Sequence, residues 1–129
     1  MMRLHHIGVA CRDIREEMDR LSILHEVIER TPVVRDPEQD AEVALLTLAD
    51  GTRIELVAGP QVETLVKRNI GLYHLCFEVA DIGAEIGRLE SEGARLLIPP
   101  KPAVLFGGRT VAFLYVDYGM IELLGQKQG

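Results

Sequence analysis

Apolar and polar positions in the first half of the chain predict one helix among several strands. The apolar run from Leu4 to Cys11 predicts a buried strand. The next apolar residues, Ile14, Met18 and Leu21, recur at helical spacing and predict a helix from about 13 to 24, with Asp13 as its N-cap. Three more strands are predicted, at residues 27–34, 42–48 and 52–57.

The second half predicts the same order of elements after a short connecting helix at 61–69. A strand at 72–80 precedes a helix from 81 to about 92, which Gly93 ends. The next strand, 94–98, is expected to stop at the prolines of residues 99–102, because proline cannot extend a ladder of hydrogen bonds. Gly107 and Gly108 form a turn with Arg109. The last two strands are predicted at 110–116 and 120–124.

These two patterns are copies of one unit. His6 and His74 each open an apolar run, and Asp-Ile follows each histidine at positions +7 and +8. The last strand of each half carries one glutamate, Glu55 or Glu122. The histidines lie 68 residues apart and the glutamates 67, so a single period relates both pairs. The chain is therefore predicted to be a duplicated strand, helix and three strands.

Two histidines and two glutamates in register predict a metal site. A pseudo-two-fold axis between the copies would bring the four side chains towards one point, and imidazole nitrogens with carboxylate oxygens suit a divalent first-row metal. A lone histidine on a strand is usually structural, but its recurrence with glutamates in register favours metal binding. Apolar strands also seldom bury a carboxylate without a partner or a metal.

Composition excludes some functions and favours none. A chain of 129 residues with 47% hydrophobic and 26% charged residues is typical of one globular domain. The net charge of −6 argues against nucleic-acid binding. Since no apolar run reaches a membrane span and no signal peptide is recognisable, we expect a cytoplasmic protein. Cys11 and Cys76 are expected to be buried free thiols, and His5 to be structural.

Several motifs resemble the vicinal-oxygen-chelate superfamily, the fold of glyoxalase I and the bleomycin-resistance proteins. They are His6-Ile-Gly-Val, Ile54-Glu-Leu-Val, Gly71-Leu-Tyr-His-Leu, Gly107-Gly108 before an apolar strand, and Ile121-Glu-Leu-Leu. Their details are most similar to the methylmalonyl-CoA epimerases. The resemblance implies an α+β fold of two tandem βαβββ modules that form a half-open β-barrel cleft. It covers 1–129 as a single domain, with module 1 at about 3–58, a connecting segment at 59–70 and module 2 at about 71–125.

The same resemblance implies a function and a set of site residues. The function is a metal-dependent epimerase or isomerase that removes a proton α to a carbonyl of an acyl-CoA. The implied metal ligands are His6, Glu55, His74 and Glu122, holding one Co, Ni, Mn or Zn ion. Glu122 and Glu42 are the candidate bases, with Glu42 considered because Ala44 stands where some epimerases place a second catalytic glutamate. Arg109 is a candidate for binding an anionic substrate.

The resemblance leaves alternatives open. Bacterial glyoxalase I uses the same ligand types in the same chain order, so a lactoylglutathione lyase fits the four residues equally well. A non-catalytic drug-binding protein of the same fold would not require them. The superfamily implies a homodimer, with the cleft either inside one chain or across the interface.

Overall fold

The computed structural model describes residues 2–126, and its chain divides into two compact units. The N-terminal unit is His6–Tyr73, and the C-terminal unit combines Met1–His5 with His74–Gly129. The boundary falls inside the first strand, β1 (Arg3–Ala10), between two consecutive histidines.

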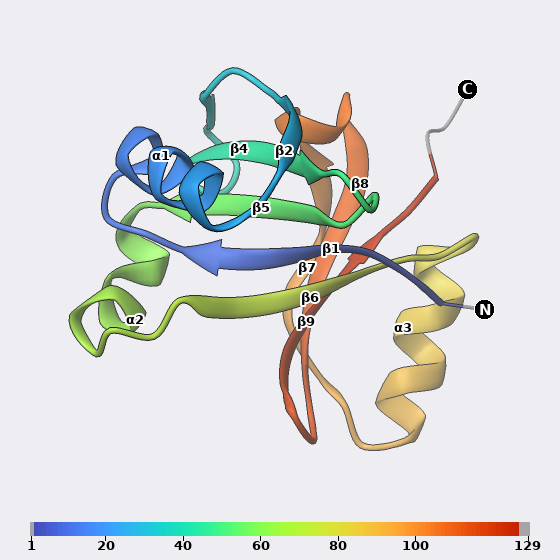
Figure 1. Ribbon diagram of the computed structural model, residues 1–129. Coiled ribbons are helices and arrows are strands. Elements are labelled where there is room, and N and C mark those ends of the chain that lie inside the picture. Colours follow the sequence, from blue (N-terminus) through green and yellow to red (C-terminus); the bar gives the residue numbers. More distant parts are fainter. Residues whose placement is uncertain (1, 127–129) are drawn as a thin grey trace. The chain divides into compact units, whose positions relative to one another are not determined.

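The N-terminal unit is a half-sheet with one long helix. Its elements are β1, α1 (Ile14–Leu24), β2 (Val27–Arg30), β3 (Val34–Asp36), β4 (Ala41–Leu48), β5 (Arg53–Ala58), the short turn η1 (Pro60–Val62) and α2 (Glu63–Lys67). The strand order is β2-β4-β5-β1, with β3 also pairing with β4. Helix α1 packs beside β4 and β5 (Figure 1).

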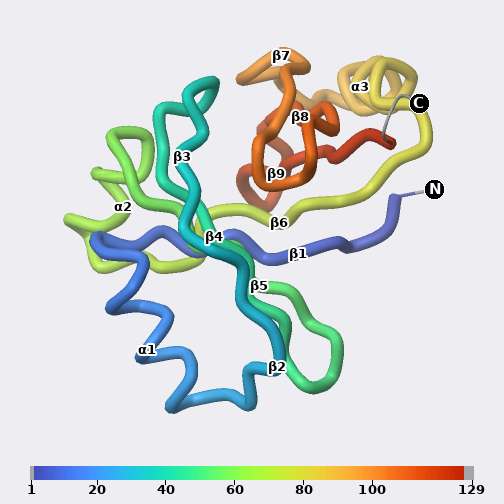
Figure 2. Tube along the Cα trace, turned by 90° about the horizontal axis from the view of Figure 1, so that it is seen from above, coloured from blue at the N-terminus to red at the C-terminus, as the bar shows by residue number. Residues whose placement is uncertain are grey.

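The C-terminal unit repeats this arrangement. Its elements are β6 (Leu72–Glu78), α3 (Ile82–Ser91), β7 (Arg95–Ala103), the short turn η2 (Val104–Phe106), β8 (Arg109–Val116) and β9 (Gly119–Leu124). The order is β6-β9-β8-β7, and Figure 2 shows β8 and β9 side by side. In both units the first strand runs parallel to the last, and the last is antiparallel to the one before it. The predicted α+β class and the open sheet of two βαβββ modules are confirmed.

Both long helices begin at the aspartate that the repeat predicts. The Asp13 side chain accepts a hydrogen bond of 3.0 Å from the Glu16 amide, and the Asp81 side chain accepts one of 3.0 Å from the Ala84 amide. Each helix buries one apolar stripe against its own half-sheet. In residues 2–126 no helix is both long and apolar enough to cross a membrane.

The structure differs from the sequence prediction in two strands. The predicted strand 27–34 is two short strands, β2 and β3, separated by residues 31–33. The prediction that the prolines end the seventh strand is wrong, because β7 continues to Ala103 and Pro102 pairs with Thr110. Strand β7 is the outermost strand of its half-sheet, so a missing amide on its open side costs no ladder bond. The ladder register shifts between Ile98 and Lys101.

Candidate metal centre

The N-terminal unit buries His6 beside Glu55. The Nε2 atom of His6 lies 3.3 Å from the Oε1 atom of Glu55, and the two residues are 1% and 3% exposed. In the parallel β1–β5 ladder Gly8 is the register partner of Glu55. Since side chains alternate along a strand, His6 and Gly8 share the face on which Glu55 lies. The ladder therefore sets the histidine against the carboxylate.

This pair lies on the face of the half-sheet that points away from α1. The other face carries the core that packs with α1, formed by Ala44, Leu46, Ile54, Leu56 and Ala58. On β4, Leu45 pairs with Glu55 and Val43 pairs with Val57. The part of β4 beside Glu55 is therefore apolar.

The C-terminal unit buries His74 beside Glu122. The Nε2 atom of His74 lies 3.0 Å from the Oε1 atom of Glu122, and the residues are 5% and 1% exposed. Phe113 on β8 pairs with Glu122, and its ring meets the His74 ring edge to face, with centroids 5.4 Å apart at 85°. An aromatic edge-to-face contact of this kind restricts ring orientation. Phe113 thus holds the imidazole beside the carboxylate.

The two pairs have the same construction. Glu55 pairs with Gly8, which stands two residues after His6 on β1. Glu122 pairs with Cys76, which stands two residues after His74 on β6. The repeat seen in the sequence is therefore also a repeat of ladder register. Burying a carboxylate this deeply is costly unless a positive partner or a cation compensates it.

The chemistry of these donors fits a divalent cation. Each unit offers one imidazole nitrogen and one carboxylate oxygen, both buried and within contact distance of each other. Two such pairs would supply two nitrogens, two oxygens and two negative charges, a set that Co, Ni, Mn and Zn ions accept.

The predicted base Glu42 is not brought to this face. Glu42 is exposed and pairs with Ala58, which belongs to the core under α1. Glu42 and Ala44 do share a face of β4, as the two-residue spacing implied, but it is the face opposite Glu55. The structure therefore argues against Glu42 as a second base.

Arg109 lies at the first position of β8 and is held by two partners. Its guanidinium forms an ion pair with Glu78, and its Nε donates a hydrogen bond of 2.8 Å to the carbonyl of Gly125. The hydrogen bond from Arg109, above all, lowers the pKa of Glu78. Two residues along β8, Val111 pairs with Leu124, so Arg109 lies on the face of Glu122. The Arg109 side chain is 20% exposed and can meet solvent or a ligand at this edge.

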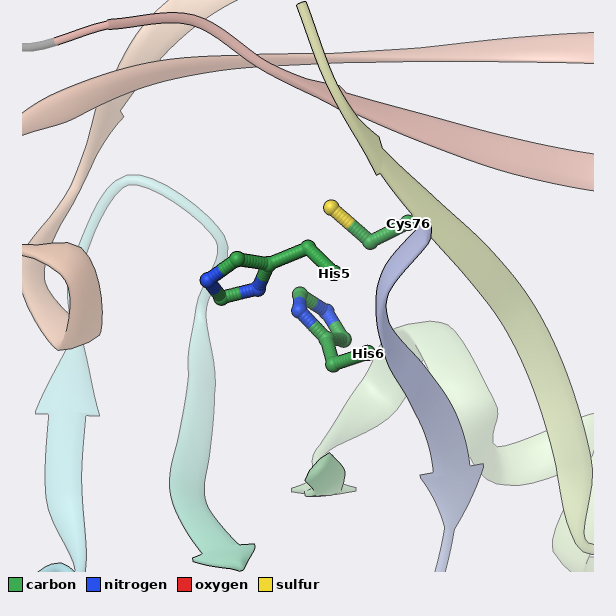
Figure 3. Close-up of side chains that lie close together, drawn as sticks. All are labelled: His5, His6 and Cys76. Carbon is green, nitrogen blue, oxygen red and sulfur yellow. The ribbon is translucent and has the colours of Figure 1, made fainter. Parts of the chain in front are cut away.

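Sequence reasoning assigned no ligand role to His5 and Cys76. In the structure a ring nitrogen of His5 and the Sγ atom of Cys76 lie within 4.8 Å of each other (Figure 3). The sequence places Cys76 two residues after His74 and therefore on the same face of its strand, but it contains no signal that brings His5 to Cys76.

Comparisons with known proteins agree with this fold. The duplicated βαβββ units with buried histidine–glutamate pairs define a protein of the glyoxalase class. The chain belongs to the glyoxalase/bleomycin resistance protein/dioxygenase superfamily, whose family model matches residues 5–113.

The relatives in this superfamily include epimerases. The chain is 30% identical over 120 residues to the ethylmalonyl-CoA/methylmalonyl-CoA epimerase of Cereibacter sphaeroides, covering 88% of this chain and 87% of the relative. The crystal structure of methylmalonyl-CoA epimerase from Mycobacterium tuberculosis is similar with a TM-score of 0.76, at 22% identity over 97% of this chain and 88% of that one. A variant of the Streptomyces coelicolor methylmalonyl-CoA epimerase, in complex with 2-nitronate-propionyl-CoA, has a TM-score of 0.71, at 25% identity over 98% and 95%.

Proposed function

We propose that His6, Glu55, His74 and Glu122 hold one divalent metal ion, and that the protein is an epimerase or isomerase acting α to the carbonyl of an acyl-CoA. The observation that carries the proposal is the repeated ladder register, which sets one buried imidazole against one buried carboxylate in each unit. The epimerase relative at 30% identity supports the reaction class, and the epimerase complex with an acyl-CoA analogue supports the ligand class.

Each proposed ligand has a defined part. A bound divalent cation supplies Lewis-acid polarisation of the substrate carbonyl, which makes the α-proton more acidic. Glu122 accepts that proton on a carboxylate oxygen and returns it. His74 orients this carboxylate from 3.0 Å, and Phe113 orients His74. The apolar side chains of Val111 and Leu124 on the same face keep water from the proton in transit.

Arg109 is proposed to receive an anionic group of the substrate. Its guanidinium is on the face of Glu122 and is fixed by Glu78 and the Gly125 carbonyl. A fixed planar guanidinium binds a carboxylate or phosphate with less loss of side-chain entropy than a free one.

A glyoxalase I-type lyase is the second candidate, and the placement of Glu42 favours it. On the face of Glu55, strand β4 presents Val43 and Leu45, which cannot ionise. Proton transfer therefore falls to the carboxylates of the two pairs. Moving one proton between neighbouring carbons of a hemithioacetal needs only one base, whereas an epimerase that uses two bases would need both Glu55 and Glu122 as bases.

The test is metal analysis of the purified protein together with hydrogen–deuterium exchange at the α-carbon of methylmalonyl-CoA in D₂O. His74→Ala removes a proposed ligand, and His25→Ala removes an exposed histidine at the end of α1 as a matched control. We expect metal in the wild type and in His25→Ala but not in His74→Ala, with exchange following the metal.

The outcomes separate the parts of the proposal. Metal without exchange would retain the metal centre and move the substrate search to hemithioacetals of methylglyoxal. Protein purified without metal, and unable to bind added Co²⁺ or Ni²⁺, would overturn the metal centre and make the two pairs structural.

A further inference from the structure

Cys76 and His5 form a second pair of metal-binding atoms in the C-terminal unit. Cys76 is 0% exposed on β6, and His5 is partly buried on β1. A ring nitrogen of His5 lies within 4.8 Å of the Cys76 sulfur. Figure 3 shows both side chains, which come from separate strands. Neither residue is among the four proposed ligands of the metal centre described above.

The His5 ring is held in place by its neighbours. It meets the Phe106 ring edge to face, with centroids 5.4 Å apart at 88°. Phe106 ends η2, so this contact ties the imidazole to the turn before β8. The Glu78 carboxylate lies on the Cys76 face of β6; its pKa is lowered first by the hydrogen bond from Arg109, and the charge of His5 contributes too. The His5–Cys76 pair is therefore accompanied by the Glu78 carboxylate and by the Phe106 ring that contacts His5.

The separation of the two atoms suits a bridging cation. Zinc-like cations bind sulfur at about 2.3 Å and imidazole nitrogen at about 2.0 Å in tetrahedral geometry, so one cation spans about 3.5 Å between these atoms. The His5 nitrogen and the Cys76 sulfur lie within 4.8 Å of each other, a limit that includes this span.

We propose that His5 and Cys76 form a binding site for a thiophilic d10 cation, with no protein ligand in common with the four-ligand metal centre. A thiolate with an imidazole selects Cu(I), Zn²⁺ or Cd²⁺ over the hard cations that carboxylates and water prefer. On binding, Cys76 releases its thiol proton to solvent and the sulfur forms the bond to the metal.

Cys11 provides a matched control in the same chain. It is also buried, at 5% exposed, and burial with the nearby Glu17 and Asp13 raises its pKa to about 12. Within residues 2–126, Cys11 belongs to neither of the two clusters of possible metal ligands. A sulfur–metal signal from this protein is therefore assigned to one thiol by removing each in turn.

The experiment is a titration of the protein, as purified with its resident ions, with Cd²⁺, followed by the ultraviolet charge-transfer absorbance of the sulfur–cadmium bond. The proposed ligands of the other centre contain no sulfur, so cadmium bound there is silent in this measurement. The variants are Cys76→Ala, Cys11→Ala and His5→Phe. The last removes the imidazole nitrogens but retains a ring for the contact with Phe106. Circular dichroism checks that each variant is folded.

We expect the wild type and Cys11→Ala to show a saturating charge-transfer band at one cadmium per chain. Cys76→Ala should lose the band, and His5→Phe should bind cadmium at least about 10-fold more weakly, as expected for the loss of one ligand. A band that disappears only in Cys11→Ala would overturn the proposal, as would an unchanged affinity in His5→Phe. Failure here leaves the metal analysis of His74→Ala unaffected, so the two sites are tested independently.

Discussion

Glu42 and Glu55 lie on opposite faces of the β4–β5 ladder. On β4, Leu45 is the partner of Glu55 and therefore shares its face. Glu42 lies three residues before Leu45, and because side chains alternate along a strand, Glu42 points to the opposite face. The carboxylate of Glu55 is buried with His6, whereas Glu42 is exposed on the face under α1. Of the glutamates on these two strands, only Glu55 contributes to the buried pair.

Neutralising Glu42 should therefore leave catalysis intact. We expect Glu42→Gln to exchange the α-proton of the substrate at the wild-type rate, because its side chain lies on the wrong face of the strand. Glu122→Gln should lower the rate by about 10²–10⁴-fold, the usual contribution of a general base. Solvent deuterium exchange measured by NMR gives both rates under one set of conditions. A large loss in Glu42→Gln would contradict the assignment of faces.

Local signals in the sequence predicted most of the fold and singled out the histidine and the glutamate that each unit sets side by side. Asp13 and Asp81 cap the predicted helices, and the spacing of His6 and His74 carries over into ladder register. These features depend on neighbouring residues or on the repeat, both of which are visible in one sequence.

The features that were missed depend on how strands pair and on which strand is outermost in its half-sheet. Whether Glu42 faces Glu55 is decided by the β4–β5 register, which the spacing from Ala44 does not contain. Pro102 is tolerated in β7 because that strand is outermost in its half-sheet. The approach of His5 to Cys76 joins residues on the first strands of the two copies, 71 positions apart in the sequence. None of these relationships has a local signature.

The two capping aspartates should contribute similar amounts to stability. Each accepts one backbone hydrogen bond of 3.0 Å at the start of a helix that covers its own half-sheet. Loss of an N-cap side chain costs about 0.5–2 kcal/mol, so we expect Asp13→Ala and Asp81→Ala each to lower the free energy of unfolding by that amount. Urea denaturation measures the change. Asp13→Asn and Asp81→Asn, which retain a capping oxygen, should be nearly neutral, and equal losses in alanine and asparagine variants would argue against capping as the cause.

Phe113 should affect metal binding, and its neighbour Leu114 should not. Both residues are buried on β8 but on opposite faces, with Phe113 against His74 and Leu114 in the core under α3. We expect Phe113→Leu and Leu114→Val to lose about 0.5–3 kcal/mol of stability, typical of core substitutions. Only Phe113→Leu should also weaken metal binding, because only it releases the His74 ring. Competition with a chelator gives the affinities, and equal affinities in the two variants would remove Phe113 from the positioning of His74.

The ion pair of Glu78 and Arg109 should stabilise the protein only above the acid range. Arg109 lowers the pKa of Glu78 in the folded protein, whereas the unfolded chain titrates near the ordinary value of about 4.3. At pH values between the folded and the unfolded pKa of Glu78, the folded state therefore binds fewer protons than the unfolded state. The contribution of the Glu78–Arg109 pair to the free energy of unfolding falls as the pH drops through the folded pKa. Both side chains are partly exposed, so the full contribution should not exceed about 1 kcal/mol.

Comparison of the wild type with Glu78→Gln across pH tests this linkage. We expect the difference in the free energy of unfolding to be constant from pH 7 down to about 5 and then to shrink towards zero as the unfolded and then the folded carboxylate becomes protonated. Glu85→Gln removes the pair of Glu85 with Arg88 on the surface of α3 and is the control for a solvated ion pair. Added salt should reduce the effect of Glu85→Gln more than that of Glu78→Gln, since exposed charges are screened more strongly. A Glu78→Gln difference that persists undiminished at pH values below the folded pKa would show that the side chain stabilises through packing and not through its charge.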